Sequence, residues 1–99
     1  MTEHYASGNW HVSEGKEEQF LGLWREWLEW TRDNREGFRA ARLIREESDP
    51  RHFISFAEWN SLDLRAAWKN DPGFAERQTA CRALCDEFYG SDYTVAVEI

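Results

Sequence analysis

The chain has 99 residues, which suffices for one hydrophobic core and is too short for two, so residues 1–99 are expected to form one domain. A net charge of −7, from 19 acidic against 12 basic residues, argues against nucleic acids and anionic membranes as partners, because it repels phosphate groups. Without a membrane-length apolar run or a basic and apolar leader, the sequence predicts a cytoplasmic protein.

Along the chain, alternation predicts a first strand over residues 4–13, with Ala6, Gly8, Trp10 and Val12 on one face. The period then becomes helical over residues 16–33. One stripe of that helix is formed by Phe20, Trp24, Trp27, Leu28 and Thr31. Trp10, Trp24 and Trp27 should therefore face one another across the strand and the helix.

Two further strands are predicted over residues 38–46 and 52–59, joined as a hairpin by the turn at 47–50. Ser61 can cap a short helix that contains Trp68, and Asp71-Pro72 starts another. The last helix is predicted to place Phe74, Gln78, Cys81, Cys85 and Phe88 on one side. A turn at 90–91 and a final strand over 93–99 complete the chain.

This order is β-α-β-β-α-β with the second helix broken in two, the pattern of an α+β ferredoxin-like fold with a four-stranded antiparallel sheet. Helices can cover only one face of such a sheet. The third strand carries apolar residues on both faces, including Phe53 and Phe56. A second copy of the sheet would cover the other face, so we expect a homodimer that pairs through it.

Cys81 and Cys85 are four residues apart, a spacing that forms neither a zinc site nor a redox Cys-x-x-Cys motif. Two small buried hydrophobic residues are the favoured interpretation. His4, His11 and His52 stand singly, so no metal site is expected. His52 is a candidate general base if it reaches a pocket, but a surface or interface position is favoured.

Arg42 and Arg45 lie on opposite faces of the second strand. One of them is expected to face the sheet interior and to pair with a carboxylate such as Glu58.

Motifs over almost the whole chain resemble the antibiotic biosynthesis monooxygenase family. The first is Trp10-x-Val12-x-x-Gly15-Lys16-Glu17-Glu18-x-Phe20. It is followed by Gly37-Phe38, Arg42-Leu43, Asp49-Pro50-x-x-Phe53-x-Ser55-x-x-x-Trp59-x-Ser61 and Ala67-Trp68-x-x-x-Pro72-x-Phe74. The resemblance implies a dimeric α+β barrel with one pocket per subunit between sheet and helices. It also implies two branches, one of cofactor-free oxygenases that convert phenols or anthrones to quinones with O2, and one that binds and degrades haem.

The haem branch fits poorly. Trp68 matches its tryptophan, but Gly8 stands at the position of its asparagine and Gln78 at that of its iron-binding histidine. An amide is a poor haem ligand beside imidazole or thiolate. Haem degradation is therefore disfavoured, and no cofactor is expected beyond O2 as co-substrate.

The chain has six tryptophans, six phenylalanines and three tyrosines. Each of these side chains can bury about 150–250 Å² in a core, and several of them together can line a pocket for a flat ligand. Composition favours core packing. With the resemblance, Trp68 and Gln78 become the candidate catalytic residues, and Trp10, Trp24, Trp27 and Phe74 the candidate pocket walls. Gln78 interrupts an apolar stripe, so it either bridges helix to sheet or anchors a ligand oxygen.

Three hypotheses follow. The first is a cofactor-independent monooxygenase that oxidises a flat aromatic molecule. The alternative is a non-catalytic dimeric protein of the same fold that binds a small aromatic molecule or acts as a scaffold. A third, which no residue selects, is an oxygenase or isomerase of a small reactive metabolite.

Overall fold

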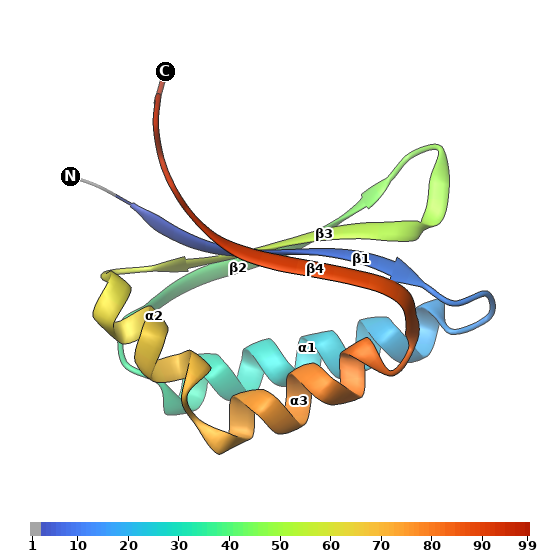
Figure 1. Ribbon diagram of the computed structural model, residues 1–99, viewed down its shortest axis with the longest axis horizontal. Helices are drawn as coiled ribbons and strands as arrows, with labels where there is room; N and C mark the ends of the chain where they lie inside the picture. Colours follow the sequence, from blue (N-terminus) through green and yellow to red (C-terminus); the bar gives the residue numbers. More distant parts are fainter. Residues whose placement is uncertain (1–2) are drawn as a thin grey trace.

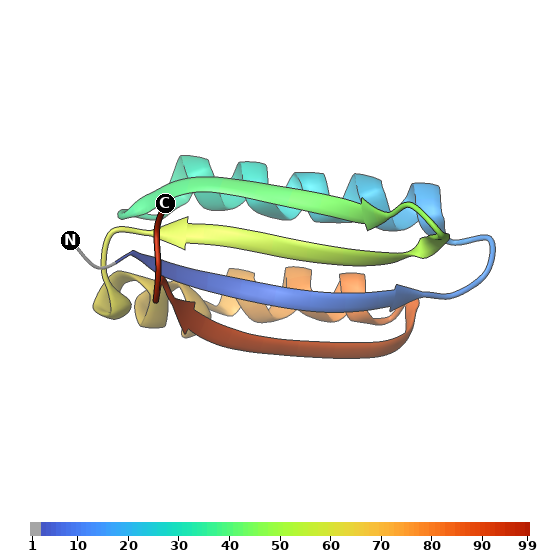
Figure 2. The ribbon, with the colours of Figure 1, turned by 90° about the horizontal axis from the view of Figure 1, so that it is seen from above.

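A four-stranded antiparallel sheet is covered on one face by three helices in the computed structural model, which describes residues 3–99 (Figure 1). The elements are β1 (His4–Val12), α1 (Glu17–Asn34), β2 (Phe38–Glu46), β3 (Asp49–Trp59), α2 (Leu62–Lys69), α3 (Pro72–Arg82) and β4 (Cys85–Thr94). The strand order is β2-β3-β1-β4, and the face away from the helices is open in Figure 2. This confirms the ferredoxin-like α+β prediction, including the second helix broken in two.

Local sequence signals explain the two short helices. The Ser61 side chain accepts a hydrogen bond from the backbone N–H of Leu64 at 3.2 Å, and Asp71 does the same for Gly73 at 2.7 Å. Pro72 occupies the first turn of α3, where its missing N–H costs nothing. No helix among residues 3–99 is long and apolar enough to cross a membrane.

The core lies between the sheet and the helices, and aromatic rings fill most of it. Trp10 is 1% exposed and its ring lies 5.3 Å from that of Phe20 and 6.2 Å from that of Trp27. Trp68 is 3% exposed and continues the cluster, with its ring 5.6 Å from Trp27. The predicted contact of Trp10 with Trp27 is therefore present, and Trp24 is partly buried and packs against the same core.

The C-terminal part of the prediction is wrong. The helix ends at Arg82, and Cys85 and Phe88 belong to β4, where they pair with Val12 and Trp10. The turn predicted at residues 90–91 is not formed, because Gly90 pairs with Gly8 within β4. A shift of register at His11/Val12 lets Cys85 and Phe88 point to the same sheet face although they are three residues apart. That spacing imitates a helical stripe.

The outer face of the sheet carries His52, which does not reach the core. Its Nδ1 lies 2.6 Å from Glu46 Oε1, its Nε2 lies 2.6 Å from Asn9 Oδ1, and its ring stacks on His11 at 4.3 Å. Hydrogen bonds from Ser48 and His52 to Glu46 lower the pKa of that carboxyl group. The favoured surface position of His52 is the one observed.

The predicted ion pair of Arg42 or Arg45 is wrong. Glu58 instead accepts a hydrogen bond from the Tyr5 hydroxyl at 3.3 Å, and the Arg45 guanidinium lies 4.7 Å from the centre of the Phe53 ring. Among residues 3–99 neither arginine forms an ion pair. Both are exposed, so water solvates their charge and no carboxylate is needed.

Candidate functional site

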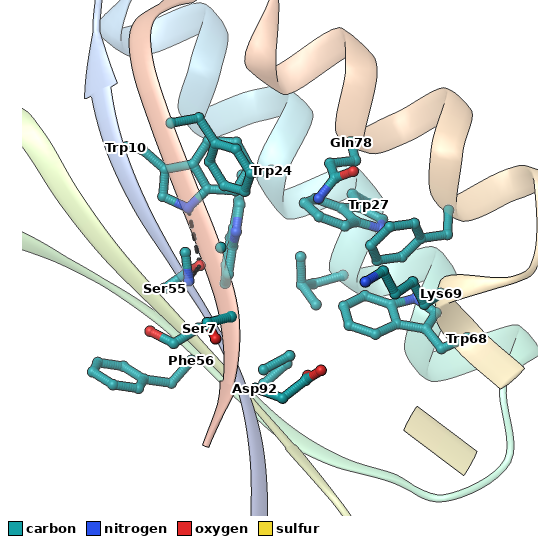
Figure 3. A pocket seen from close by; sticks show the side chains of 18 of the residues that line it. Ser7, Trp10, Trp24, Trp27, Ser55, Phe56, Trp68, Lys69, Gln78 and Asp92 are labelled. Carbon is teal, nitrogen blue, oxygen red and sulfur yellow. Dashed lines mark hydrogen bonds between the residues drawn. The ribbon is translucent and has the colours of Figure 1, made fainter. Parts of the chain in front are cut away.

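A cavity of about 260 Å³ lies between the sheet and the helices (Figure 3). It is lined by all six residues that the sequence indicated, namely Trp10, Trp24, Trp27, Trp68, Phe74 and Gln78. Ser55, Arg65, Asp92 and the glycines of β1 and β4 contribute further lining. The structure thus brings the candidate residues together, while their catalytic and binding roles stay predictions.

Two paired glycines leave the room for this cavity on the sheet side. A Cβ atom on Gly8 would lie 2.6 Å from Trp10 Nε1 and 2.9 Å from Ser55 Oγ. A Cβ atom on Gly90 would lie 2.8 Å from the Phe88 ring. Because Trp10 and Phe88 are themselves in contact, with ring centres 4.2 Å apart, a larger residue at either position would displace a packed ring.

Ser55, on the neighbouring strand β3, holds the indole of Trp10 in place. Its Oγ accepts hydrogen bonds from Trp10 Nε1 at 2.9 Å and from the backbone N–H of Gly8 at 3.1 Å. Ser55 is 8% exposed, so these bonds are sheltered from water. The Trp10 ring is therefore held at a fixed orientation on the cavity wall.

Trp68 is locked by a second chain of hydrogen bonds. Its Nε1 donates to Thr31 Oγ1 at 3.0 Å, and the Thr31 hydroxyl donates to the carbonyl of Trp27 at 2.8 Å. Phe74 packs edge-on against Trp68, with ring centres 4.7 Å apart. Core packing and pocket lining were both possible roles for Trp68, and the structure shows that it belongs to the core and also lines the cavity.

Gln78 is half-buried on α3 and points toward the cavity beside Trp27 (Figure 3). Among residues 3–99 no side-chain hydrogen bond involves its amide, so the predicted bridge from helix to sheet is not formed. An amide in this position retains a donor and an acceptor for a ligand.

Arg65 brings a buried charge to the cavity from α2. Its side chain is 10% exposed, and its Nε donates to Asp92 Oδ1 of β4 at 2.8 Å. The guanidinium carbon lies 5.1 Å from the centre of the Trp68 ring. The exposed side chains of Lys69 and Arg82 add positive charge to the lining.

The sequence reasoning missed Ser55, Arg65 and Asp92 as site residues. Ser55 had a signal, because it is the polar residue in the run Phe53, Ser55, Ala57 and Trp59 on one face of β3. Arg65 lies one helical turn before Trp68 on the buried side of α2, a place where an arginine is costly. Asp92 had no usable signal, because its strand was predicted in the wrong place.

Neither cysteine offers a reactive thiol. Burial raises the pKa of Cys81 to about 12 and that of Cys85 to about 11. Cys81 is fully buried, which agrees with its interpretation as a core residue, while Cys85 is partly buried. Among residues 3–99 no group of three metal-binding side chains is close enough to hold a metal ion.

Comparison with known proteins places these observations in a family. The model of a family described as antibiotic biosynthesis monooxygenase matches residues 4–80. No curated protein gives a significant match.

Several solved structures have the same fold at low sequence identity. A mutant of SnoaB, a cofactor-independent oxygenase from Streptomyces nogalater, is 22% identical, with a TM-score of 0.89 over 98% of this chain and 96% of that chain. A conserved protein from Methanosarcina mazei Go1 is 19% identical, with a TM-score of 0.83 over 94% and 92% of the two chains. A structure described as antibiotic biosynthesis monooxygenase is 20% identical, with a TM-score of 0.77 over 100% of both chains.

Proposed function

The chain belongs to the antibiotic biosynthesis monooxygenase family, and on this premise we propose that it is a cofactor-independent monooxygenase of a flat aromatic phenol or anthrone. The observation that carries the proposal is the cavity itself, whose walls include four indole rings and the rings of Phe74 and Phe88, with polar side chains between them. Its volume of about 260 Å³ is slightly below the range of about 300–1,000 Å³ common for ligand pockets, which favours two or three fused rings over larger polycycles.

The proposed reaction needs only substrate and O2. Binding among aromatic rings removes water, and hydrogen-bond donors favour the deprotonated phenol or anthrone, whose proton passes to solvent. The carbanion gives one electron to O2, and the resulting radicals combine to form a C–O bond. The peroxide takes up a proton and loses water, which leaves a quinone carbonyl. One oxygen atom of O2 ends in the product and the other in water.

Gln78 is proposed to orient a substrate oxygen. In Gln78→Ala we expect about a tenfold loss of kcat/KM for oxygen uptake, the size of one hydrogen bond of about 1.5 kcal/mol. The assay uses metal-stripped protein with anthrones and dihydroxynaphthalenes that have a free para position, with and without EDTA. Trp68→Phe is expected to lower uptake as well, because it loosens the ring that Thr31 holds.

Gln19→Ala is the matched control, because Gln19 is exposed on α1 and does not line the cavity. Uptake above the uncatalysed rate that EDTA leaves unchanged, and that falls in Gln78→Ala but not in Gln19→Ala, supports the proposal. Absence of uptake with every substrate from a folded protein contradicts it.

A non-catalytic binding protein is the second candidate, and one observation favours it. The only carboxylate among the described lining residues is Asp92, which already accepts a hydrogen bond from Arg65. The cavity therefore offers no free base to remove a substrate proton. Tight binding of a bicyclic phenol without oxygen uptake would select this function.

We also propose that two copies pair through the open sheet face. Apolar side chains are exposed there, including Ile44 at 50% and Phe56 at 36%, and a groove of about 490 Å³ runs beside them. Burying such a patch against its two-fold copy removes it from water.

In Phe56→Glu we expect the dimer dissociation constant to rise about 30-fold or more, because a carboxylate would be buried at the centre of the interface. Sedimentation velocity across a dilution series measures this. Leu62→Glu is the control, since Leu62 is 51% exposed but lies on α2, away from the open sheet face. An unchanged association in Phe56→Glu contradicts the proposed interface.

A further inference from the structure

Arg65 has spare hydrogen-bonding capacity in a place where a charge is expensive. Its side chain is 10% exposed and lies over the rings of Trp68 and Phe74, at 5.1 and 5.8 Å from their centres. Within residues 3–99 its one ion pair is Nε to Asp92, and its Nη1 is buried with no partner. A guanidinium has five N–H donors, and the hydrogen bond to Asp92 uses one of them.

The partner carboxylate does not neutralise Arg65 in a sealed pair. The Asp92 side chain is 48% exposed, so water solvates much of its charge, whereas the guanidinium lies among rings. A buried cation that meets only a solvated carboxylate is incompletely compensated. An anion inside the cavity would complete the compensation of the Arg65 charge.

Other polar groups of the cavity wall also offer hydrogen-bond donors. Both lone pairs of Ser55 Oγ accept hydrogen bonds, from Trp10 and from Gly8, which leaves its own O–H to donate. Lys69 and Arg82 add two more positive charges to the lining of a chain whose net charge is −7. These groups therefore favour a ligand that accepts hydrogen bonds and carries negative charge.

We propose that Arg65 binds an ionised oxygen of the ligand, so that the cavity selects aromatic anions over neutral aromatic molecules of the same shape. The anion is a phenolate or enolate, or a ring carboxylate. This inference rests on the cavity of the proposed function and assigns the substrate class for it. For a phenol or anthrone, an arginine within contact distance stabilises the anion that reacts with O2.

Binding measurements separate the two sources of the anion. Calorimetric titration compares 2-naphthoate with 2-naphthamide, which differ in charge and hardly in shape. We expect naphthoate to bind at least tenfold more tightly, and Arg65→Gln to weaken naphthoate binding about 10- to 100-fold while changing naphthamide binding less than twofold. For the phenolate source, absorbance titration of 4-nitro-1-naphthol should show a pKa about one unit or more lower when bound, and no such shift in Arg65→Gln.

A second variant, Asp92→Asn, keeps the test valid if Arg65→Gln folds poorly. Asp92→Asn removes the competing carboxylate and leaves the arginine, so naphthoate should bind more tightly; a purely structural ion pair predicts no gain. Arg77→Gln is the matched control, because the Arg77 guanidinium also lies over a ring, 4.2 Å from Trp30, but does not line the cavity.

Naphthoate binding no tighter than naphthamide binding, including binding of neither, overturns the inference, as does a preference that Arg65→Gln leaves intact. The outcome is distinct from that of the oxygenase proposal. An anion preference without oxygen uptake contradicts only the oxygenase, and oxygen uptake without an anion preference contradicts only the role of Arg65.

Discussion

Replacing Trp68 by alanine is expected to lower the free energy of unfolding by about 3–5 kcal/mol. Trp68 is 3% exposed, and its indole contacts Trp27, Trp59 and Phe74 at ring-centre distances of 5.6, 4.9 and 4.7 Å. Removing the ring leaves a hole among large, rigid side chains that cannot collapse into it. For a domain whose stability is about 5–15 kcal/mol, this is a large fraction.

Urea unfolding measures the loss, and Trp68→Phe is the matched comparison. That variant keeps most of the ring volume but leaves Thr31 Oγ1 without its donor, so it should cost only about 1–2 kcal/mol. If the alanine variant loses less than 1 kcal/mol, or no more than the phenylalanine variant, Trp68 is not packed as described.

Replacing Gly8 by alanine is expected to destabilise the protein by about 1–3 kcal/mol although it adds a single methyl group. The added Cβ would lie 2.6 Å from Trp10 Nε1 and 2.9 Å from Ser55 Oγ. Trp10 cannot move aside easily, since Phe20 and Phe88 pack against its ring. The same methyl group enters the cavity, so binding of a bicyclic ligand should fall with stability.

Gly22→Ala is the control for this experiment. Gly22 lies inside α1, and nothing lies within 4 Å of a Cβ placed on it, so alanine should stabilise the helix by about 1 kcal/mol. Thermal and urea unfolding of the two variants should therefore move in opposite directions. A stabilised Gly8→Ala variant would mean that the floor of the cavity is not as tight as the structure shows.

Most of the fold could be predicted because its signals are local. The alternation of β1, the aromatic stripe of α1 and the caps Ser61 and Asp71 each act within a few residues. The strand β4 could not be predicted in the same way. Its register shift brings Cys85 and Phe88 to one face, and a spacing of three residues reads as a helix unless the pairing with β1 is known.

The candidate site likewise contains residues that the sequence indicated and residues that it did not. Trp10, Trp24, Trp27, Trp68, Phe74 and Gln78 were found from periodicity and from the resemblance, and the fold brings them to one cavity. Arg65 and Asp92 come together from α2 and β4, 27 residues apart, through a contact that exists only in the folded chain. Their ion pair could not be read from the sequence.

The most direct test of the proposed oxygenase is the origin of the new oxygen atom. The metal-stripped protein is incubated with an anthrone under ¹⁸O2, and the quinone is analysed by mass spectrometry, with unlabelled quinone in H2¹⁸O as the control for exchange. We expect one ¹⁸O atom in each enzymatically formed quinone, since the other leaves as water. Quinone labelled from water instead of O2, or formed no faster than without protein, would contradict the proposed function.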